Sequence, residues 1–172
     1  MKTKLPLPEA QKIAARVIDA LATYCARIEV AGSIRRQSPQ VGDIEIVCQP
    51  KMGADLFGQP YPLPVPTEGL GRHEVSGDRY RKILLPENVQ LDLFIVLPPA
   101  QWGVIFAIRT GGAEFSRRLV TSRLHGGLLP PQYVVEDGAV HSAVTNKIVP
   151  TPEESDFFAL CGLDNIPPQE RN

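Results

Sequence analysis

The sequence predicts an α+β fold: a mixed or antiparallel sheet with helices, followed by a smaller C-terminal lobe that is mainly helical. Three observations support this prediction. An N-terminal stretch repeats apolar residues at helical spacing, the segments after it alternate apolar and polar residues, and a helix-rich remainder follows Pro98–Pro99. We therefore expect two domains, at residues 1–98 and 99–172.

The first half of the chain is expected to contain one helix and four strands. Ile13, Val17 and Leu21 recur at helical spacing and predict a helix over residues 8–27. Alternation of apolar and polar residues then predicts strands at residues 27–31, 42–47, 79–85 and 89–97. Residues 50–66 are rich in proline and are expected to form a loop.

The second half is expected to contain short helices and one hairpin. Apolar spacing predicts helices at residues 101–108, 114–125 and 152–160. Thr151 is expected to be the N-cap of the last helix. Asp137–Gly138 is a typical hairpin turn, here between strands at 133–136 and 139–142.

Composition places the chain among globular proteins and excludes several other classes. The 172 residues are 43% apolar and 22% charged, which suffices for a buried core. The chain lacks a run of about 18 apolar residues that would span a membrane, and its N-terminus lacks the apolar segment of a secretory signal. Cys25, Cys48 and Cys161 are far apart and odd in number, which predicts a reducing, cytoplasmic location without a zinc site or disulfide framework. The net charge is −1, so a polyanionic partner would be met by local basic patches.

Three carboxylates are the main candidates for chemistry. Asp43 and Glu45 are two apart in a predicted strand, so their side chains leave the same face. Asp92 interrupts an apolar strand, where a buried carboxylate needs partners. If the two strands pair side by side, the three acids converge, and divalent cations such as Mg²⁺ would relieve their repulsion. For Asp43 and Glu45 alone, the alternative is a solvated strand face.

A glycine–serine pair followed by two arginines is a candidate phosphate site. Gly32–Ser33 comes directly after a predicted strand, and Arg35–Arg36 follow closely. Glycine lets a phosphate approach the backbone, serine and exposed amides donate hydrogen bonds, and arginine adds charge-assisted contacts. Alone, Gly32–Ser33 is typical of a turn; the acid pair ten residues beyond Ser33 favours a site.

Two basic segments are candidates for nucleic-acid binding. The first carries Arg109, Arg117, Arg118 and Arg123, and the second carries Arg79, Arg81 and Lys82. Basic side chains contact phosphates, and each contact would add to the salt dependence of binding. For Arg117–Arg118 alone, the alternative is a solvated helix face.

Together these motifs resemble the signature of the polymerase β-type nucleotidyltransferases, and most closely the family X DNA polymerases. The matching segments are Ala31–Arg36, Gly42–Glu45, Gln90–Leu93, Trp102–Phe106, Thr110–Gly112, Pro152–Glu154 and Ile166–Arg171. The resemblance implies a nucleotidyltransferase palm at residues 1–98 and a thumb-like lobe at 99–172 that binds nucleotide and DNA.

The resemblance also implies a role for each matched residue. Asp43, Glu45 and Asp92 would hold two Mg²⁺ ions, with Mn²⁺ as a substitute, and Asp92 would lie nearest the attacking primer 3′-hydroxyl. Ser33 and Arg36 would bind the β- and γ-phosphates. The nucleotide-binding set implied in this way is Gly32, Ser33, Arg36, Gly42, Arg109, Thr110, Gly111, Gly112 and Ser116.

The sequence differs from the family's pattern at five positions. Glu45 stands where the polymerases usually have aspartate, an arrangement that resembles the kanamycin-type nucleotidyltransferases. Gln90 replaces an arginine, Ile108–Arg109 replace an aromatic pair, and Ser116 replaces an asparagine. The family's lyase domain and helix-hairpin-helix segments have no counterpart in the sequence.

These observations predict a magnesium-dependent DNA polymerase of the family X type, a kind of enzyme used in DNA repair. It would add nucleotides to a primer 3′-hydroxyl and release pyrophosphate. The expected partners are a DNA primer–template and a nucleoside triphosphate, without a membrane, and the protein is expected to be a monomer. Two alternatives stay open: a nucleotidyltransferase with a small-molecule or other non-DNA acceptor, and a non-catalytic module that binds nucleic acid or nucleotide.

Overall fold

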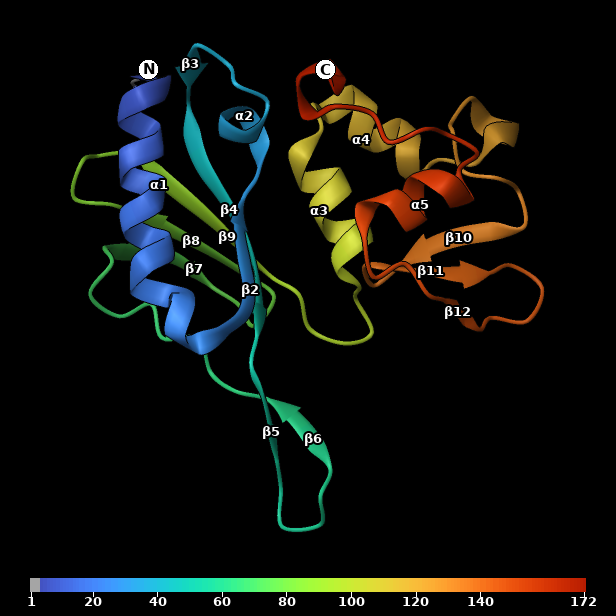
Figure 1. Cartoon of the computed structure of the whole chain (residues 1–172), viewed down its shortest axis with the longest axis horizontal. Helices are drawn as coiled ribbons and strands as arrows, with labels where there is room; N and C mark the ends of the chain where they lie inside the picture. Colours follow the sequence, from blue (N-terminus) through green and yellow to red (C-terminus); the bar gives the residue numbers. More distant parts are fainter. Residues whose placement is uncertain (1–3) are drawn as a thin grey trace. The chain divides into compact units, whose positions relative to one another are not determined.

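The computed structural model describes residues 4–172, and the chain divides into one compact unit ending at Leu97 and a second at Pro98–Asn172. Within the described residues the fold is α+β, with five α-helices, one mixed five-stranded sheet and smaller antiparallel sheets (Figure 1). None of the helices in this range is both long enough and apolar enough to cross a membrane.

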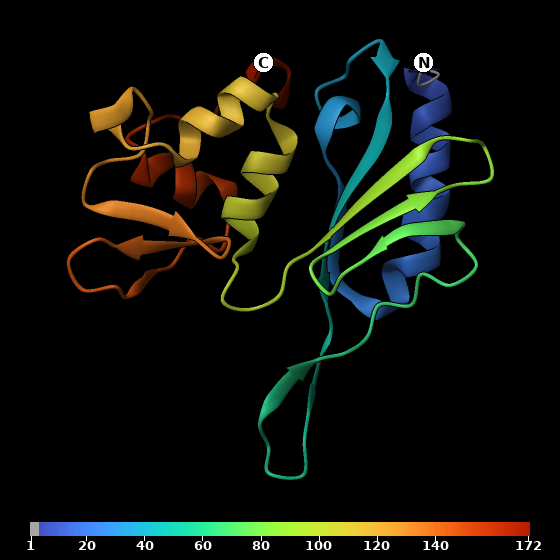
Figure 2. The same ribbon diagram turned by 180° about the vertical axis from the view of Figure 1, so that it is seen from behind.

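The first unit is built on the five-stranded sheet. Its strands lie side by side in the order β2 (Cys25–Val30), β4 (Asp43–Pro50), β9 (Gln90–Ile95), β8 (Tyr80–Leu84) and β7 (Arg72–Ser76) (Figure 2). The central strands β4 and β9 run parallel, and the other neighbours are antiparallel. The predicted strands at 42–47, 79–85 and 89–97 are therefore present, whereas β7 was not predicted.

Helix α1 (Leu7–Leu21) packs on one face of this sheet (Figure 1). Its residues Ile13 and Val17 form a buried cluster with Ile44, Ile46 and Leu93 of the two central strands. Because alternate residues of a strand point to opposite faces, burying this set on α1 turns the intervening polar residues of β4 and β9 to the other face. The core of the unit thus sets where its polar groups emerge.

The first helix is shorter than predicted. It ends at Leu21, a 3₁₀ turn covers Ala22–Tyr24, and β2 already begins at Cys25. Cys25 pairs with Pro50 of β4 and is buried. Strand pairing and burial here outweigh the weak helical preference of this segment.

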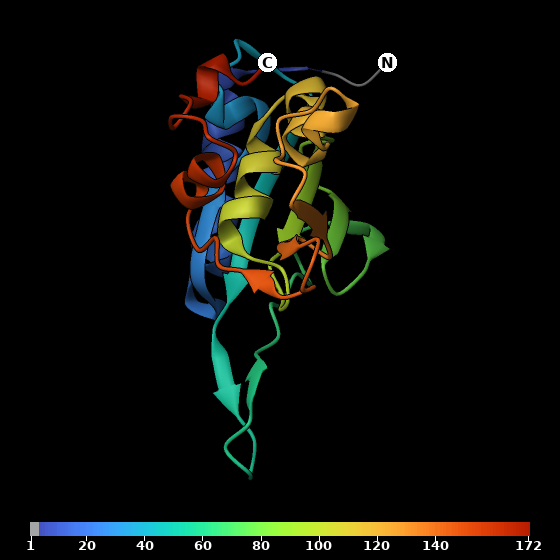
Figure 3. The same cartoon turned by 90° about the vertical axis from the view of Figure 1, so that its right-hand side faces the viewer.

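Residues 50–66, predicted to be a loop, contain a second hairpin. Strands β5 (Met52–Ala54) and β6 (Pro60–Pro62) pair with each other and extend away from the main sheet (Figure 3). Prolines are compatible with a strand where their nitrogens face outward from an edge. A further short pair, β1 (Leu5–Pro6) with β3 (Gln40–Val41), lies beside α1.

The second unit packs three helices with a small antiparallel sheet. Its elements are α3 (Trp102–Thr110), α4 (Ala113–Val120), α5 (Glu154–Leu160), β10 (Tyr133–Glu136), β11 (Ala139–Ser142) and β12 (Ile148–Val149). The helix predicted at 114–125 is divided, because α4 ends at Val120 and a 3₁₀ turn follows at Arg123–His125. The β10–β11 hairpin turns at Asp137–Gly138 as predicted, with both residues at positive φ.

The prediction that Thr151 caps the last helix is wrong. Glu153 is the N-cap of α5, and its side chain and that of Asp156 form a reciprocal capping box. Thr151 is instead fully buried, and its hydroxyl donates to Gln101 Oε1 at 3.1 Å.

The end of the chain is fixed to α5 by a buried ion pair. Arg171 follows the 3₁₀ turn Pro168–Glu170, and its Nη1 lies 2.6 Å from Glu154 Oε1. Its Nε donates to the Ile166 carbonyl at 2.7 Å, and its guanidinium lies 4.7 Å from the centre of the Phe158 ring. Arg171 therefore acts as part of the core of the second unit.

Candidate active site

The three candidate carboxylates lie on the same face of the two central strands. Asp43 and Glu45 alternate with the fully buried Ile44 and Ile46, so they emerge on the face opposite α1. In the parallel ladder Glu45 is the direct partner of Asp92, while Asp43 pairs with Gln90. The two strands that carry the three acids, β4 and β9, therefore lie side by side, which was the condition for the acids to converge.

Two neighbouring side chains hold the Asp92 carboxylate, which is only 8% exposed. The Tyr80 hydroxyl donates to Asp92 Oδ1 at 2.6 Å. Gln90 Nε2 lies 2.8 Å from Oδ1 and 2.7 Å from Oδ2. Hydrogen bonds to an ionised acceptor are stronger than neutral ones, and they compensate the burial of this carboxylate.

Tyr80 is a site residue that the sequence analysis missed. It belongs to β8, the antiparallel neighbour of β9, and its ring stacks on Phe94 at 5.2 Å between ring centres. No local pattern marked it, because the pairing of β8 with β9 that makes Lys82 the direct partner of Asp92 is seen only in the folded chain. Residues two apart share a strand face, so Tyr80 lies on the carboxylate face.

The glycine–serine turn packs directly against Glu45. Residues Gly32–Arg35 form a single helical turn, α2, after β2, and the Ala31 N–H donates to the Glu45 carbonyl at 2.8 Å. Gly32 has φ +56°, and a Cβ atom added to it would overlap the Glu45 carboxylate. Glycine is therefore required here both by the backbone and by the neighbouring acid.

The Ser33 hydroxyl is buried and has no hydrogen-bond partner in the described part of the chain. A buried hydroxyl without a partner costs about 1–3 kcal/mol, so such a group calls for an explanation. An oxygen atom of a bound ligand would supply the missing acceptor. Arg36 ends the same turn and is half-buried. Gly42, just before β4, has open space beside it.

The carboxylates share a face but do not form a closed metal cage. Among residues 4–172 no group of three or more His, Cys, Asp or Glu side chains is arranged to hold a metal ion. The reason lies in their contacts: Asp92 is held by Tyr80 and Gln90, and Glu45 lies against Gly32. The donor set itself consists of carboxylate oxygens, the ligands that suit Mg²⁺.

Substituting Gly32 by alanine is expected to destabilise the first unit by about 1–3 kcal/mol, because the added methyl group meets Glu45 in a left-handed backbone conformation. Urea unfolding measures this change. Gly42→Ala is the matched control, since a Cβ atom there meets no atom within 4 Å. Equal stability of the two variants would show that the turn does not pack on Glu45.

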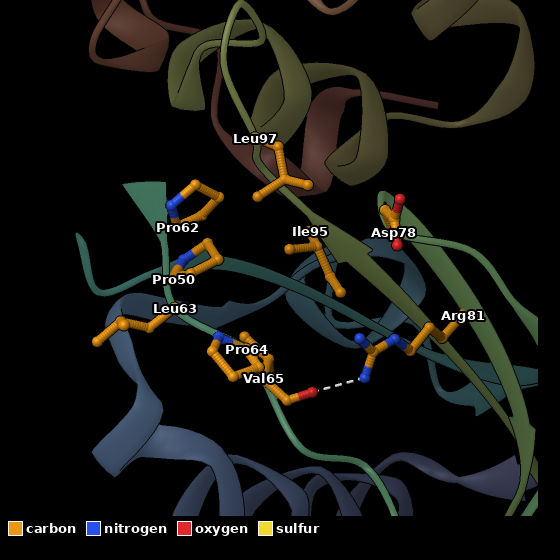
Figure 4. A pocket seen from close by; sticks show the side chains of 9 residues that line it. All are labelled: Pro50, Pro62, Leu63, Pro64, Val65, Asp78, Arg81, Ile95 and Leu97. Carbon is orange, nitrogen blue, oxygen red and sulfur yellow. Dashed lines mark hydrogen bonds between the residues drawn. The ribbon is translucent and has the colours of Figure 1, made fainter. Parts of the chain in front are cut away.

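The basic residues of β8 do not form a single patch. Lys82 lies on the carboxylate face, whereas Arg81 points to the other face, and the exposed Arg79 precedes the strand. Arg81 Nη1 donates to the Val65 carbonyl at 2.6 Å (Figure 4). It also donates to Thr67 Oγ1 at 2.8 Å. The grouping of these three residues therefore needs correction: Arg81 anchors a loop within the first unit.

In the second unit, packing explains the glycine pair between α3 and α4. Thr110 is fully buried at the end of α3. A Cβ atom at Gly111 would lie 2.6 Å from Phe115 Cδ1, and the Gly112 N–H donates to the Arg171 carbonyl at 2.6 Å. The Ser116 hydroxyl donates to the Ile108 carbonyl at 2.7 Å. These contacts give residues assigned to nucleotide binding a structural role within their own unit.

The arginines of the second unit differ in their surroundings. Arg117 forms an exposed ion pair with Glu114 at 2.7 Å, which lowers the pKa of that carboxyl. Arg123 Nη2 donates to the Cys161 carbonyl at 2.5 Å and so joins the 3₁₀ turn to the end of α5. Arg109 and Arg118 are exposed on the helices. Arg123 is thus an anchoring residue, while the other three present charge at the surface.

Comparison with models of known protein families gives no match, and comparison with curated proteins gives none either.

Proposed function

We propose that the chain is a divalent-cation-dependent nucleotidyltransferase that adds nucleotides to the 3′-hydroxyl of a DNA primer and releases pyrophosphate. The observation that carries this proposal is the parallel register of β4 and β9. This register sets Asp92 beside Glu45, and Asp43 lies two residues before Glu45 on the same face of the sheet, opposite the face that packs on α1. Sites on rigid strands hold reacting groups more precisely than sites on loops.

Each residue has a distinct role in the proposed reaction. Ser33 would donate its buried hydroxyl to a triphosphate oxygen, and Arg36 would stabilise the charge that develops on the leaving pyrophosphate. Asp92 would orient the primer 3′-hydroxyl, whose oxygen attacks the α-phosphorus as the bond to the pyrophosphate oxygen breaks. DNA as the acceptor is supported by the exposed arginines of α4 and by the sequence resemblance to family X polymerases.

Asp43, Glu45 and Asp92 would hold the divalent cations. When bound, two such ions lower the pKa of the attacking hydroxyl and neutralise the leaving phosphates. In the structure Asp92 already has two hydrogen-bond donors on its carboxylate. We infer that Tyr80 and Gln90 keep this acid in place on the strand and that it shares its oxygens between them and the cation site.

Primer extension tests the proposal. The full chain is mixed with Mg²⁺, labelled primer and all four deoxynucleoside triphosphates, with and without a template strand. Extension that depends on Mg²⁺ supports the proposal, and template dependence of the added sequence shows templated synthesis. Labelling of a small-molecule acceptor alone would replace the DNA acceptor, and binding without any transfer would overturn the enzymatic function.

Tyr80→Phe is expected to lower kcat about 10- to 100-fold, because a hydrogen bond to a charged group contributes about 1.5–3 kcal/mol. The phenyl ring keeps its stacking on Phe94. Steady-state primer extension should therefore show a reduced kcat with an unchanged KM for the nucleotide. Tyr24→Phe, at an exposed tyrosine of the same unit, is the control. An unchanged kcat for Tyr80→Phe would show that this hydroxyl does not position Asp92.

A further inference from the structure

The tip of the β5–β6 hairpin presents two large apolar side chains to solvent. Leu56 is 100% exposed and Phe57 is 89% exposed. The tip that carries them is ordered: Asp55 Oδ1 accepts the Phe57 and Gln59 N–H groups, both at 2.8 Å, and the Asp55 N–H donates to the Gln59 carbonyl at 2.9 Å. An ordered tip with exposed apolar groups is typical of an interaction surface.

The two edges of this hairpin differ. The Leu63 N–H bonds to the Lys51 carbonyl at 2.8 Å and Asp55 bonds to Gln59, so the alternation of an antiparallel pair turns Met52 and Ala54 outward on β5. On β6 the outward positions are Pro60 and Pro62, which have no N–H to donate. Within residues 4–172 no strand pairs with the outer edge of β5. Of the two strands in this hairpin, only β5 therefore has outward N–H groups as well as carbonyls with which another strand could pair.

The sequence of β5 is complementary to itself in an antiparallel pairing. With a two-fold axis at Gly53, Met52 of one copy exchanges both backbone hydrogen bonds with Ala54 of the other. The same register sets Lys51 opposite Asp55, a pair of opposite charges, on both sides of the axis. Both exposed charges of the hairpin are thereby matched.

Leu56 and Phe57 form the turn that follows Asp55, so this register brings the tip of one hairpin next to Pro50 of the other copy. Pro50 lines a pocket of about 300 Å³ at the base of the hairpin, together with Pro62, Leu63, Ile95 and the charged Asp78 and Arg81 (Figure 4). The tip of one hairpin therefore lies at the base pocket of the other, and the reverse contact follows from the symmetry. Such an isologous contact closes on itself and yields a dimer rather than a filament.

We propose that the β5 edge and the Leu56–Phe57 tip form a homodimer interface between two copies of this chain. This inference is independent of the proposed activity and departs from the monomer expected from the sequence. An aromatic side chain buries about 150–250 Å², so two tips and a three-residue edge stay below the roughly 800 Å² per partner of a standard interface. We therefore expect a weak dimer with a Kd of about 10–100 µM.

Sedimentation equilibrium of the full chain between about 1 and 300 µM tests the proposal, since these concentrations bracket the expected Kd. The mean mass should rise from one chain toward two. Leu56→Asp should raise Kd at least about tenfold and should leave folding unchanged, because Leu56 is fully exposed. Ala54→Pro should do the same by removing an outward N–H, whereas Ala54→Ser keeps it and should dimerise normally.

The charge pair has its own test. Lys51→Glu should weaken the dimer because the new carboxylate faces Asp55, and the loss should shrink in high salt. Lys147→Glu, an equal change at an exposed lysine of the second unit, is the control. A wild-type chain that stays a monomer at 300 µM would overturn the proposal, and so would a dimer that Leu56→Asp and Lys51→Glu leave unchanged.

Discussion

Replacing Asp92 by asparagine is expected to reduce nucleotide transfer by at least about 10³-fold, the scale on which groups that act in the transition state are lost. Asparagine keeps the shape of the side chain and an oxygen that can accept from the Tyr80 hydroxyl, now 2.6 Å from Asp92. What it loses is the negative charge beside Glu45. Primer extension under single-turnover conditions measures the effect.

The folding of this variant separates chemistry from structure. Because one charge is removed from a position that is 8% exposed, the free energy of unfolding should not fall by more than about 1–2 kcal/mol. Glu87→Gln removes an exposed carboxylate of the β8–β9 turn and should transfer nucleotides normally. Wild-type transfer rates in Asp92→Asn would remove Asp92 from the site.

Replacing Arg171 by methionine is expected to destabilise the second unit by about 3–5 kcal/mol, because it leaves the Glu154 carboxylate buried without its cation. The two side chains are 2% and 10% exposed. The variant also loses the hydrogen bond to Ile166 and the contact with the Phe158 ring. Methionine keeps most of the volume, so the loss reflects the charge rather than a cavity.

The fluorescence of Trp102, the one tryptophan of the chain, reports on unfolding of this unit. Arg117→Met is the matched control: it breaks an exposed ion pair with Glu114 and should change the free energy of unfolding by less than about 1 kcal/mol. The double variant Arg171→Met/Glu154→Gln should recover part of the loss. Equal stability of the Arg171 and Arg117 variants would show that the buried pair does not support the unit.

The shared face of Asp43 and Glu45 was predictable because a strand has a period of two and Ile44 and Ile46 had to be buried. The same period of two places Arg81 and Lys82 on opposite faces of β8, so the two residues could not form one patch. The hairpin turn at Asp137–Gly138 was predictable for a similar reason, since its residues favour positive φ locally.

Other features depend on contacts between distant parts of the chain. Nothing within β9 specifies that it lies beside β4, so the Glu45–Asp92 pairing was only a conditional expectation. The Tyr80 hydroxyl bond to Asp92 crosses from one strand to the next, and the Arg171–Glu154 pair joins the chain end to α5. The contact of Thr151 with Gln101, fifty residues away, likewise keeps Thr151 from capping α5, and Glu153 is the N-cap instead.

The amino-acid order alone carries the α+β character, the position of the acids within their strands and the turn residues, because these follow from periodicity and from backbone preferences over a few residues. Strand order, the partners of Asp92, the contact of Gly32 with Glu45 and the outward edge of β5 arise only in the folded chain. They require segments far apart in sequence to meet, and that meeting is governed by the burial of the whole core rather than by any local pattern.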